Sequence, residues 1–175
     1  MMKRLLTVYA SILLVSSVAL GDSWILKREV TDNEFKFDDT RVVLHYDSTQ
    51  DRSFPKYTLR VHEKEKLVAE HDGIGFEKLF VSPDKGFFVG VSNRGLIKDA
   101  YVIFDRQGKI VKRQPHDPKK VHYKSMSVTL IRLWYDAEKP DVKFDVADGV
   151  LRNVTINGAD GNRVSLLDKA PAEKP

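Results

Sequence analysis

Apolar and polar residues alternate along most of this chain, and the alternation constrains the fold more than any other sequence feature. In residues 57–63 (YTLRVHE), Tyr57, Leu59 and Val61 fall on one side of an extended chain and polar residues fall on the other. Residues 142–146 (VKFDV) repeat the pattern. A period of two indicates β-strands with one buried face, whereas the spacing of an amphipathic helix is nearly absent. The sequence therefore predicts an all-β protein.

Short segments that favour chain reversal separate these strands. Residues 82–86 (SPDKG), 106–109 (RQGK), 148–149 (DG) and 157–162 (NGADGN) contain Pro, Asp, Asn and Gly, whose backbone preferences suit tight turns. Strands that are separated by turns at this spacing predict an antiparallel architecture built from hairpins.

The chain also has a repeated layout. The segments that start at Tyr57 (YTLRVHEKEKLVAEHD) and at Tyr101 (YVIFDRQGKIVKRQPHD) both run from an aromatic residue through an apolar strand and a charged turn to His-Asp. Their starts are separated by the distance at which propeller blades recur, about 40–50 residues. A third hairpin starts at Val154. Further strand-like sequence precedes the three hairpins at residues 24–30 with 41–47, at 76–93, and at 125–136 with 142–146. Three four-stranded units can therefore be drawn.

Residues 81–93 (VSPDKGFFVGVSN), followed by residues 100–111 (AYVIFDRQGKIV), resemble the successive hairpins of bacterial β-propeller repeats. The chain departs from that family in carrying Asp84-Lys85-Gly86 where the repeats have Asp-Gly, and in lacking a WD-type dipeptide. Propellers typically close with four to eight blades, whereas this chain supplies three units. We therefore expect an antiparallel meander of three four-stranded blade-like units, arranged as a β-sandwich or as an open half-propeller whose edge strands need covering.

The N-terminal residues have the pattern of a secretory signal. A short basic stretch precedes an uncharged apolar run that ends at Leu20. The run is shorter than the roughly 20 apolar residues that cross a hydrocarbon core, and it suits a signal peptide. Small residues fit cleavage after Gly21, and Ser17 with Ala19 offers a second site. The alternative is an uncleaved membrane anchor; after cleavage we expect no transmembrane segment.

These patterns divide the chain into three parts. We expect a signal peptide at residues 1–21, a single all-β domain at residues 22–167 and a disordered tail at residues 168–175. The middle part fits the usual size of about 100–200 residues per domain. The tail, DKAPAEKP, has Pro, Ala and charged residues without an apolar anchor, a composition that does not support a packed core.

Cysteine content and charge restrict the compartment and the partner. The chain has no cysteine, although secreted eukaryotic domains commonly depend on disulfides. The periplasm of a Gram-negative bacterium therefore suits an exported protein of this composition best. Lys and Arg number 29 against 25 Asp and Glu, an excess too small to favour nucleic acid as the partner.

Motifs for covalent or acid–base catalysis are incomplete. Residues 90–95 (GVSNRG) nearly match the G-x-S-x-G nucleophile elbow, but Arg94 stands where the second glycine permits a tight strand-to-helix turn. Ser92 is therefore interpreted as the end of a strand. Paired carboxylates cannot be recognised in a sequence, and the clustered acids are interpreted as residues of solvated loops: Asp38, Asp39, Asp47 and Asp51.

Metal-ligand spacing is equally weak. The five histidines show neither H-x-x-x-H nor H-E-x-x-H spacing, although His45 and His62 could meet across neighbouring strands. Residues 157–162 are rich in oxygen ligands, but they lack the alternating acids and the distal Glu of a calcium loop, so a hairpin turn explains them better. We assign no catalytic residue, metal or cofactor, and no feature of the sequence requires an enzyme.

A basic segment is the first candidate for binding. Residues 109–124 contain the adjacent lysines Lys119 and Lys120, and the only acidic residue in this segment is Asp117. Outside the cytoplasm such a segment would attract an acidic protein face, an anionic glycan or an anionic lipid headgroup. The alternative is a solvated connector between hairpins.

A loop and an aromatic pair complete the candidate site. The loop SNRGLIKD carries Arg94, with Leu96 and Ile97 near its tip, and apolar loop tips contact a partner or fold onto the body of the protein. Trp134 and Tyr135 would point to opposite faces of a strand, so at most one can lie fully in the core. We expect Trp134 in the core and Tyr135 at the rim of an interface.

These features favour a non-catalytic binding protein of the inhibitor, immunity or accessory-subunit type, which recognises a protein partner through loops and an exposed sheet face. This hypothesis predicts an apolar surface patch at Leu96, Ile97 and Tyr135. The alternative is a small-molecule or anionic-glycan binder that uses the basic segment and an aromatic platform. It requires a hollow of at least about 300 Å³ that contains Trp134 or Tyr135 beside Arg or Lys. A third hypothesis is a hydrolase with paired carboxylates.

Overall fold

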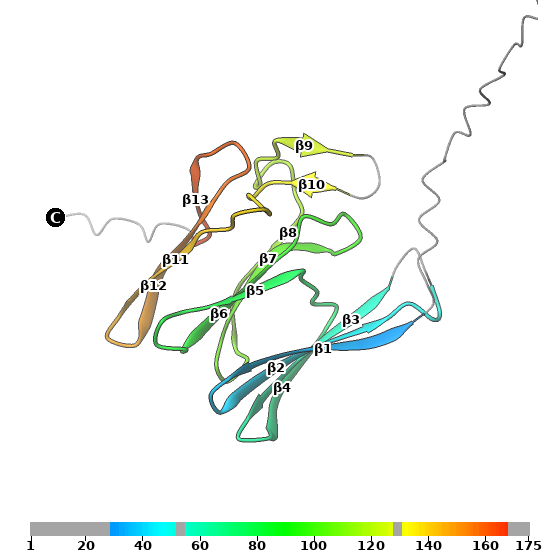
Figure 1. The fold of residues 1–175 in the computed structure, drawn as a ribbon, viewed down its shortest axis with the longest axis vertical. Helices are drawn as coiled ribbons and strands as arrows, with labels where there is room; N and C mark the ends of the chain where they lie inside the picture. Colours follow the sequence, from blue (N-terminus) through cyan, green and yellow to red (C-terminus); the bar gives the residue numbers. More distant parts are fainter. Residues whose placement is uncertain (1–28, 52–54, 128–130, 168–175) are drawn as a thin grey trace, which may run out of the picture.

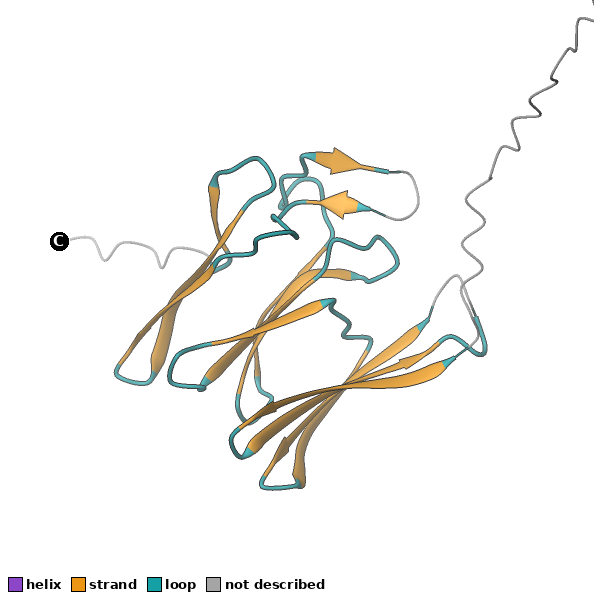
Figure 2. Cartoon of the chain, viewed as in Figure 1, coloured by secondary structure: helices purple, strands orange, loops and turns teal. Residues whose placement is uncertain are grey.

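The computed structural model describes residues 29–51, 55–127 and 131–167. Their regular secondary structure consists of β-strands paired in antiparallel sheets (Figures 1 and 2), which confirms the all-β prediction. Over these ranges no helix is present that is long and apolar enough to cross a membrane. The expected signal peptide at residues 1–21 and the expected tail at residues 168–175 lie outside the described residues.

The first sheet has four strands that pair in chain order. They are β1 (Val30–Phe37), β2 (Thr40–Asp47), β3 (Lys56–Glu63) and β4 (Lys66–Asp72). The first strand differs from the expected residues 24–30, most of which lie outside the described ranges. Most residues of β1 are polar, and only Phe35 and Phe37 pack against the core, so the alternation of this strand is weak.

The second sheet also has four strands in chain order, as the sequence predicts. They are β5 (Lys78–Val81), β6 (Phe87–Val91), β7 (Asp99–Asp105) and β8 (Ile110–Pro115). The turn between β7 and β8 packs closely on the first sheet, because a Cβ atom at Gly108 would lie 2.3 Å from the Cβ of Ala69. Glycine at this position is therefore required both by the contact and by its positive φ of 78°.

The third unit is not a single four-stranded sheet, and this part of the prediction is wrong. It comprises a short pair, β9 (Ser125–Met126) with β10 (Arg132–Leu133), and a three-stranded sheet of β11 (Val142–Ala147), β12 (Val150–Asn157) and β13 (Arg163–Ser165). The expected strand at residues 125–136 is divided because the chain reverses direction between β9 and β10, which pair antiparallel. Asn93 binds the second half of this segment. The Arg132 N–H donates to the Asn93 carbonyl at 2.7 Å, and the Trp134 N–H donates to the Asn93 side chain at 3.1 Å.

The sheet β5–β8 lies between the other two large sheets (Figure 1) and contributes to two apolar cores. Phe88 and Phe104 pack toward β1–β4 with Leu59. Their neighbours Val89 and Ile103 pack toward β11–β13. Alternate residues of β6 and β7 therefore enter opposite cores, which explains why β7 is buried along almost its whole length.

The outer faces of this stack carry mainly polar side chains. On β1–β4, Nδ1 of His45 lies 2.7 Å from Oδ1 of Asp32. On β11–β13, the Ser165 hydroxyl donates to Oδ1 of Asn153 at 2.8 Å. Polar outer faces are typical of the terminal layers of a stack, which face solvent. No sheet closes into a barrel within the described ranges.

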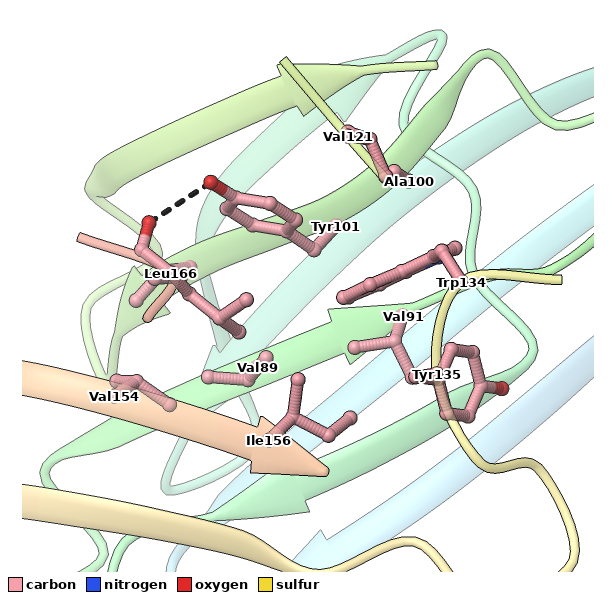
Figure 3. Packing of buried hydrophobic residues seen from close by; sticks show 11 residues of the cluster. Val89, Val91, Ala100, Tyr101, Val121, Trp134, Tyr135, Val154, Ile156 and Leu166 are labelled. Carbon is pink, nitrogen blue, oxygen red and sulfur yellow. Dashed lines mark hydrogen bonds between the residues drawn. The ribbon is translucent and has the colours of Figure 1, made fainter. Parts of the chain in front are cut away.

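Trp134 and Tyr135 are both buried, so the expectation that Tyr135 lies at a rim is wrong. Their exposed fractions are 2% and 1%. They follow the end of β10, where regular strand alternation does not apply. The two rings meet edge to face with centroids 5.1 Å apart, and the Trp134 ring also contacts Tyr101 in the core beside β11–β13 (Figure 3).

Candidate binding surface at the loop end

One end of the stack, called the loop end here, is formed by residues 92–98 between β6 and β7 and by residues 116–127 and 131–141 between β8 and β11. The opposite end carries mainly short turns (Figure 1). The two segments are joined directly, because Arg94 and Ile131 form an antiparallel bridge and the His116 N–H donates to the Lys98 carbonyl at 3.0 Å. All seven predicted binding residues therefore fall at one end of the fold: Arg94, Leu96, Ile97, Lys119, Lys120, Trp134 and Tyr135.

Glu77 organises the first of these segments, and sequence reasoning missed it. Its carboxylate accepts hydrogen bonds from the Ser92 hydroxyl at 3.1 Å and from the Asn93 N–H at 2.6 Å. Its other oxygen accepts from Nε of Arg94 at 2.8 Å. Hydrogen bonds to a charged acceptor are the stronger kind, so this carboxylate fixes the loop at the end of β6. A lone Glu before a short strand carries no sequence signal for such a role.

Asn93 connects this loop to the segment that contains the aromatic pair. Its side-chain oxygen accepts from the Trp134 N–H, and its side-chain nitrogen donates to the Tyr135 carbonyl at 3.3 Å. The Trp134 indole N–H donates to the Ser92 carbonyl at 2.7 Å. Buried polar groups that satisfy one another rigidify their surroundings. The framework under the loop end is therefore held by defined hydrogen bonds.

The structure separates the predicted binding residues into an exposed set and a buried set. The Arg94 side chain is 67% exposed, Lys119 and Lys120 are exposed, and Leu96 is half-buried. Ile97 is buried with Trp134 and Tyr135, because the loop turns inward where the Ile97 N–H donates to the Arg94 carbonyl at 3.2 Å. The predicted apolar patch is therefore wrong, and the loop is folded onto the body of the protein.

The two lysines lie on a turn whose only acid is already engaged. The Asp117 side chain accepts from the Lys119 N–H at 2.9 Å, and the Asp117 carbonyl accepts from the N–H groups of Lys120 and Val121. Val121 is buried and anchors the turn in the core. Within the described part of the chain, no carboxylate lies within salt-bridge distance of Lys119 or Lys120.

A neutral histidine lies beneath this surface. Nδ1 of His116 and the Tyr123 hydroxyl share a hydrogen bond of 2.9 Å. Burial, with a smaller effect from the Arg132 charge, lowers the pKa of His116 to about 4. Burial also raises the pKa of Tyr135, and the nearby Glu77 charge adds to this effect. His116 and Tyr135 are therefore both uncharged at neutral pH.

Ser92 and the candidate metal ligands do not assemble a reactive site. Ser92 is fully buried at the end of β6, as the interpretation of a strand end predicts, and its hydroxyl donates to Glu77. His45 lies opposite Thr58 and His62 lies opposite Arg41, so the expectation that these histidines could meet is wrong. The residues that the structure describes contain no group of three or more His, Asp or Glu side chains that could hold a metal ion.

The clustered acids are separated by the register of the first sheet. Asp38 lies in the turn between β1 and β2, whereas Asp47 ends β2 at the opposite end of the strand. Asp47 instead accepts from the Thr49 hydroxyl at 2.6 Å, and that hydrogen bond lowers the Asp47 pKa. This pair therefore does not have the geometry of a glycosidase carboxylate pair.

Two hollows of the described surface lie away from the aromatic pair. One of about 470 Å³ is lined by Glu63, Val68, Arg106 and Gln107. Another of about 280 Å³ is lined by Pro83, Asp84, Phe144, Val146 and Gly149. Neither is lined by Trp134 or Tyr135, which the alternative hypothesis of a glycan pocket requires.

Comparison with models of protein families, with curated proteins and with solved structures found no match to this chain.

Proposed function

We propose that this protein is an exported, non-catalytic binding protein whose loop end recognises an acidic face of a partner protein. The observation that carries the proposal is the exposed pair Lys119 and Lys120, which has no carboxylate partner among the residues that can be described. The adjoining loop adds Arg94, whose side chain is exposed although its Nε is paired with Glu77. Unpaired cations such as the two lysines steer an acidic partner and restrict its orientation.

The framework beneath the loops supports this function. Glu77, Asn93 and Trp134 hold the two loop segments together through buried hydrogen bonds. Binding residues are often found on loops positioned by a rigid scaffold. A loop that is already ordered loses less conformational entropy when its partner binds.

A protein partner is favoured over a glycan by the burial of both candidate aromatic residues. Sugar sites use exposed aromatic faces, whereas Trp134 and Tyr135 are enclosed in the core. The sequence pattern of residues 1–21 supports export, and the absence of cysteine suits a periplasmic location.

The test is affinity capture from the exported protein fraction of the host, with the wild-type protein and with Lys119→Glu/Lys120→Glu. The wild type should retain one dominant acidic protein, and the variant should bind it at least about tenfold more weakly, because like charges then face each other. Lys36→Glu/Lys66→Glu is the matched control. It makes the same change of charge at exposed positions beside turns and should bind as the wild type does.

Two outcomes would contradict the proposal. Equal capture by the loop-end variant and the control would remove the loop end as the binding surface. Failure of the wild type to retain any specific protein would reject protein recognition itself.

The proposal also predicts that high salt releases the captured protein, since Debye screening weakens charge pairing.

A further inference from the structure

Strand β11 leaves one edge of its sheet without a partner. The three-stranded sheet runs in the order β11, β12, β13, so β11 is an edge strand. No other strand in the described ranges pairs with its open side. Such an edge presents backbone N–H and C=O groups to which another strand can add.

The hydrogen-bond register shows which groups of β11 face the open side. The Asn157 N–H donates to the Asp141 carbonyl at 3.2 Å, which makes these two residues a bonded pair. Bonded and non-bonded pairs alternate along an antiparallel ladder, so Phe144, opposite Val154, belongs to a non-bonded pair. Consistently, the Val154 carbonyl accepts from the Leu166 N–H on its other side at 2.8 Å. The N–H and C=O of Phe144 therefore point to the open edge.

The sequence of β11 is complementary to itself in the antiparallel direction. Residues 142–146 are Val-Lys-Phe-Asp-Val. When two copies pair about Phe144, Val142 of one copy lies opposite Val146 of the other, and Lys143 lies opposite Asp145. Both charged side chains are exposed, and neither has an ion-pair partner among the described residues.

This pairing matches the backbone geometry. The two Phe144 residues would form a bonded pair, in which each N–H donates to the carbonyl of the other copy. Lys143 and Asp145 would then form the intervening non-bonded pairs, which bring opposite side chains closest, with Cα atoms about 4.5 Å apart. Opposite charges in these positions stabilise strand pairing.

The apolar side of β11 fits the same arrangement. Phe144 and Val146 line the hollow of about 280 Å³ with Pro83, Asp84 and Gly149. In an antiparallel pair the side chains of facing residues lie on the same face of the sheet. Phe144 of the second copy would therefore lie beside this hollow, while the ion pairs lie on the outer face.

We propose that this chain forms a two-fold symmetric dimer in which β11 pairs with β11 of a second copy, in register about Phe144. The arrangement joins two three-stranded sheets into one continuous sheet. Strand β1 is another open edge with an acid, a phenylalanine and a lysine in succession, but its Glu34 already pairs with Arg41 at 3.2 Å. The unpaired charges of β11 make it the better edge for self-association.

Charge reversal tests the register. Lys143→Asp gives an edge with two acids, and Asp145→Lys gives an edge with two lysines, so each variant should dimerise at least about tenfold more weakly than the wild type. A mixture of the two variants should form heterodimers, because every cross-strand pair is then Asp with Lys. The double variant Lys143→Asp/Asp145→Lys should dimerise like the wild type. Sedimentation velocity over a range of concentrations measures the wild type, both single variants, their mixture and the double variant.

Lys36→Asp is the matched control, since it makes the same substitution at an exposed position of the β1 edge. It should dimerise as the wild type does, and circular dichroism should show that every variant keeps the wild-type fold. A wild-type protein that remains monomeric at about 1 mM would overturn the proposal. Dimerisation that is unaffected by either single reversal, or a mixture that stays monomeric, would overturn it as well.

Discussion

At the scale of single residues, the contact between Asp99 and Arg113 ties two sheets together. The Asp99 side chain is fully buried, and both of its oxygens lie within 2.9 Å of Nε of Arg113. The same guanidinium donates to the Gly73 carbonyl at 2.5 Å, in the segment that follows β4. This buried carboxylate therefore depends on a single cation that also holds the neighbouring sheet.

The two partners of this pair should respond differently to substitution. Arg113→Met leaves a buried carboxylate without its charge partner, and we expect the free energy of unfolding to fall by about 3–5 kcal/mol. Asp99→Asn should lower it by about 1–2 kcal/mol, because the amide can keep a hydrogen bond and the freed guanidinium reaches water. Urea denaturation measures both values. The control is Arg152→Met, which breaks an exposed pair with Asp148 and should change the free energy of unfolding by less than about 0.5 kcal/mol. A loss for Arg113→Met as small as that of Arg152→Met would contradict the prediction.

His116 makes stability depend on pH in a defined window. Its pKa is about 4 in the folded protein and near 6.5 in an unfolded chain. Between these values the unfolded state binds more protons, so stability falls as the pH drops from 6.5 to about 4 and this contribution does not change further below that range. Part of the ring is solvated, so we expect a loss of about 1–2 kcal/mol.

The variant His116→Gln isolates this effect, because the carboxylates that titrate in the same range are present in both proteins. Urea denaturation at pH 7 and at pH 4.5 should show a larger loss for the wild type than for the variant. Parallel pH dependences of the two proteins would mean that His116 is not held in a neutral form.

At the scale of elements, the turn between β3 and β4 uses residues that disfavour its backbone conformation. Lys64 and Glu65 have φ values of 48° and 64°. Two successive positive φ values define a type I′ turn, which prefers Asn-Gly, and each side chain in this region costs about 1 kcal/mol. The hairpin therefore forms because its strands pair well, despite its turn residues.

Replacing these two residues should stabilise the protein. We expect Lys64→Asn/Glu65→Gly to raise the free energy of unfolding by about 1–2 kcal/mol. The lost contact between Glu65 and Arg41 is largely exposed and contributes little. As a control, Asp148→Asn in the turn Asp148-Gly149, where glycine already occupies a positive φ, should change stability by less than about 0.5 kcal/mol. Chemical denaturation that shows no gain for the double variant would contradict this account.

At the scale of the whole molecule, the sheet β5–β8 belongs to both apolar cores. Phe88 and Phe104 pack into one core, and Val89 and Ile103 pack into the other. Because the same strands cannot unfold from one core and remain packed in the other, both outer sheets should unfold with the middle sheet. The described layers should therefore behave as one cooperative unit.

A substitution in one core should be detected from the other. Leu59→Ala removes a fully buried side chain beside β1–β4, and we expect it to lower the free energy of unfolding by about 2–5 kcal/mol. In a Trp24→Phe background, fluorescence reports only Trp134, which lies in the other core. The fluorescence midpoint should shift together with the far-ultraviolet circular dichroism. A fluorescence transition that stays at the wild-type midpoint would show that the sheets unfold independently.

Local sequence patterns were sufficient for the β-class and for most hairpins. The alternation in residues 57–63 and the turn at residues 106–109 act over a few neighbouring residues, so both appear in the structure at the expected positions. The pattern was insufficient for β1, whose polar residues outnumber the two phenylalanines that face the core. It was also insufficient at residues 125–136, where the chain reverses between β9 and β10 and Asn93 from a distant loop binds the second half.

The sequence by itself determined the alternating strands, the turns between them and the loop segments in which the candidate binding residues lie. Tertiary structure decided which of those residues reach solvent: Ile97 and Tyr135 are buried, whereas Lys119 and Lys120 remain exposed. It also decided that β11, whose charges are complementary about Phe144, lies at an open edge. The reason is physical: alternation and turn preference act between neighbours in the chain, whereas burial and edge position depend on which layers cover a residue.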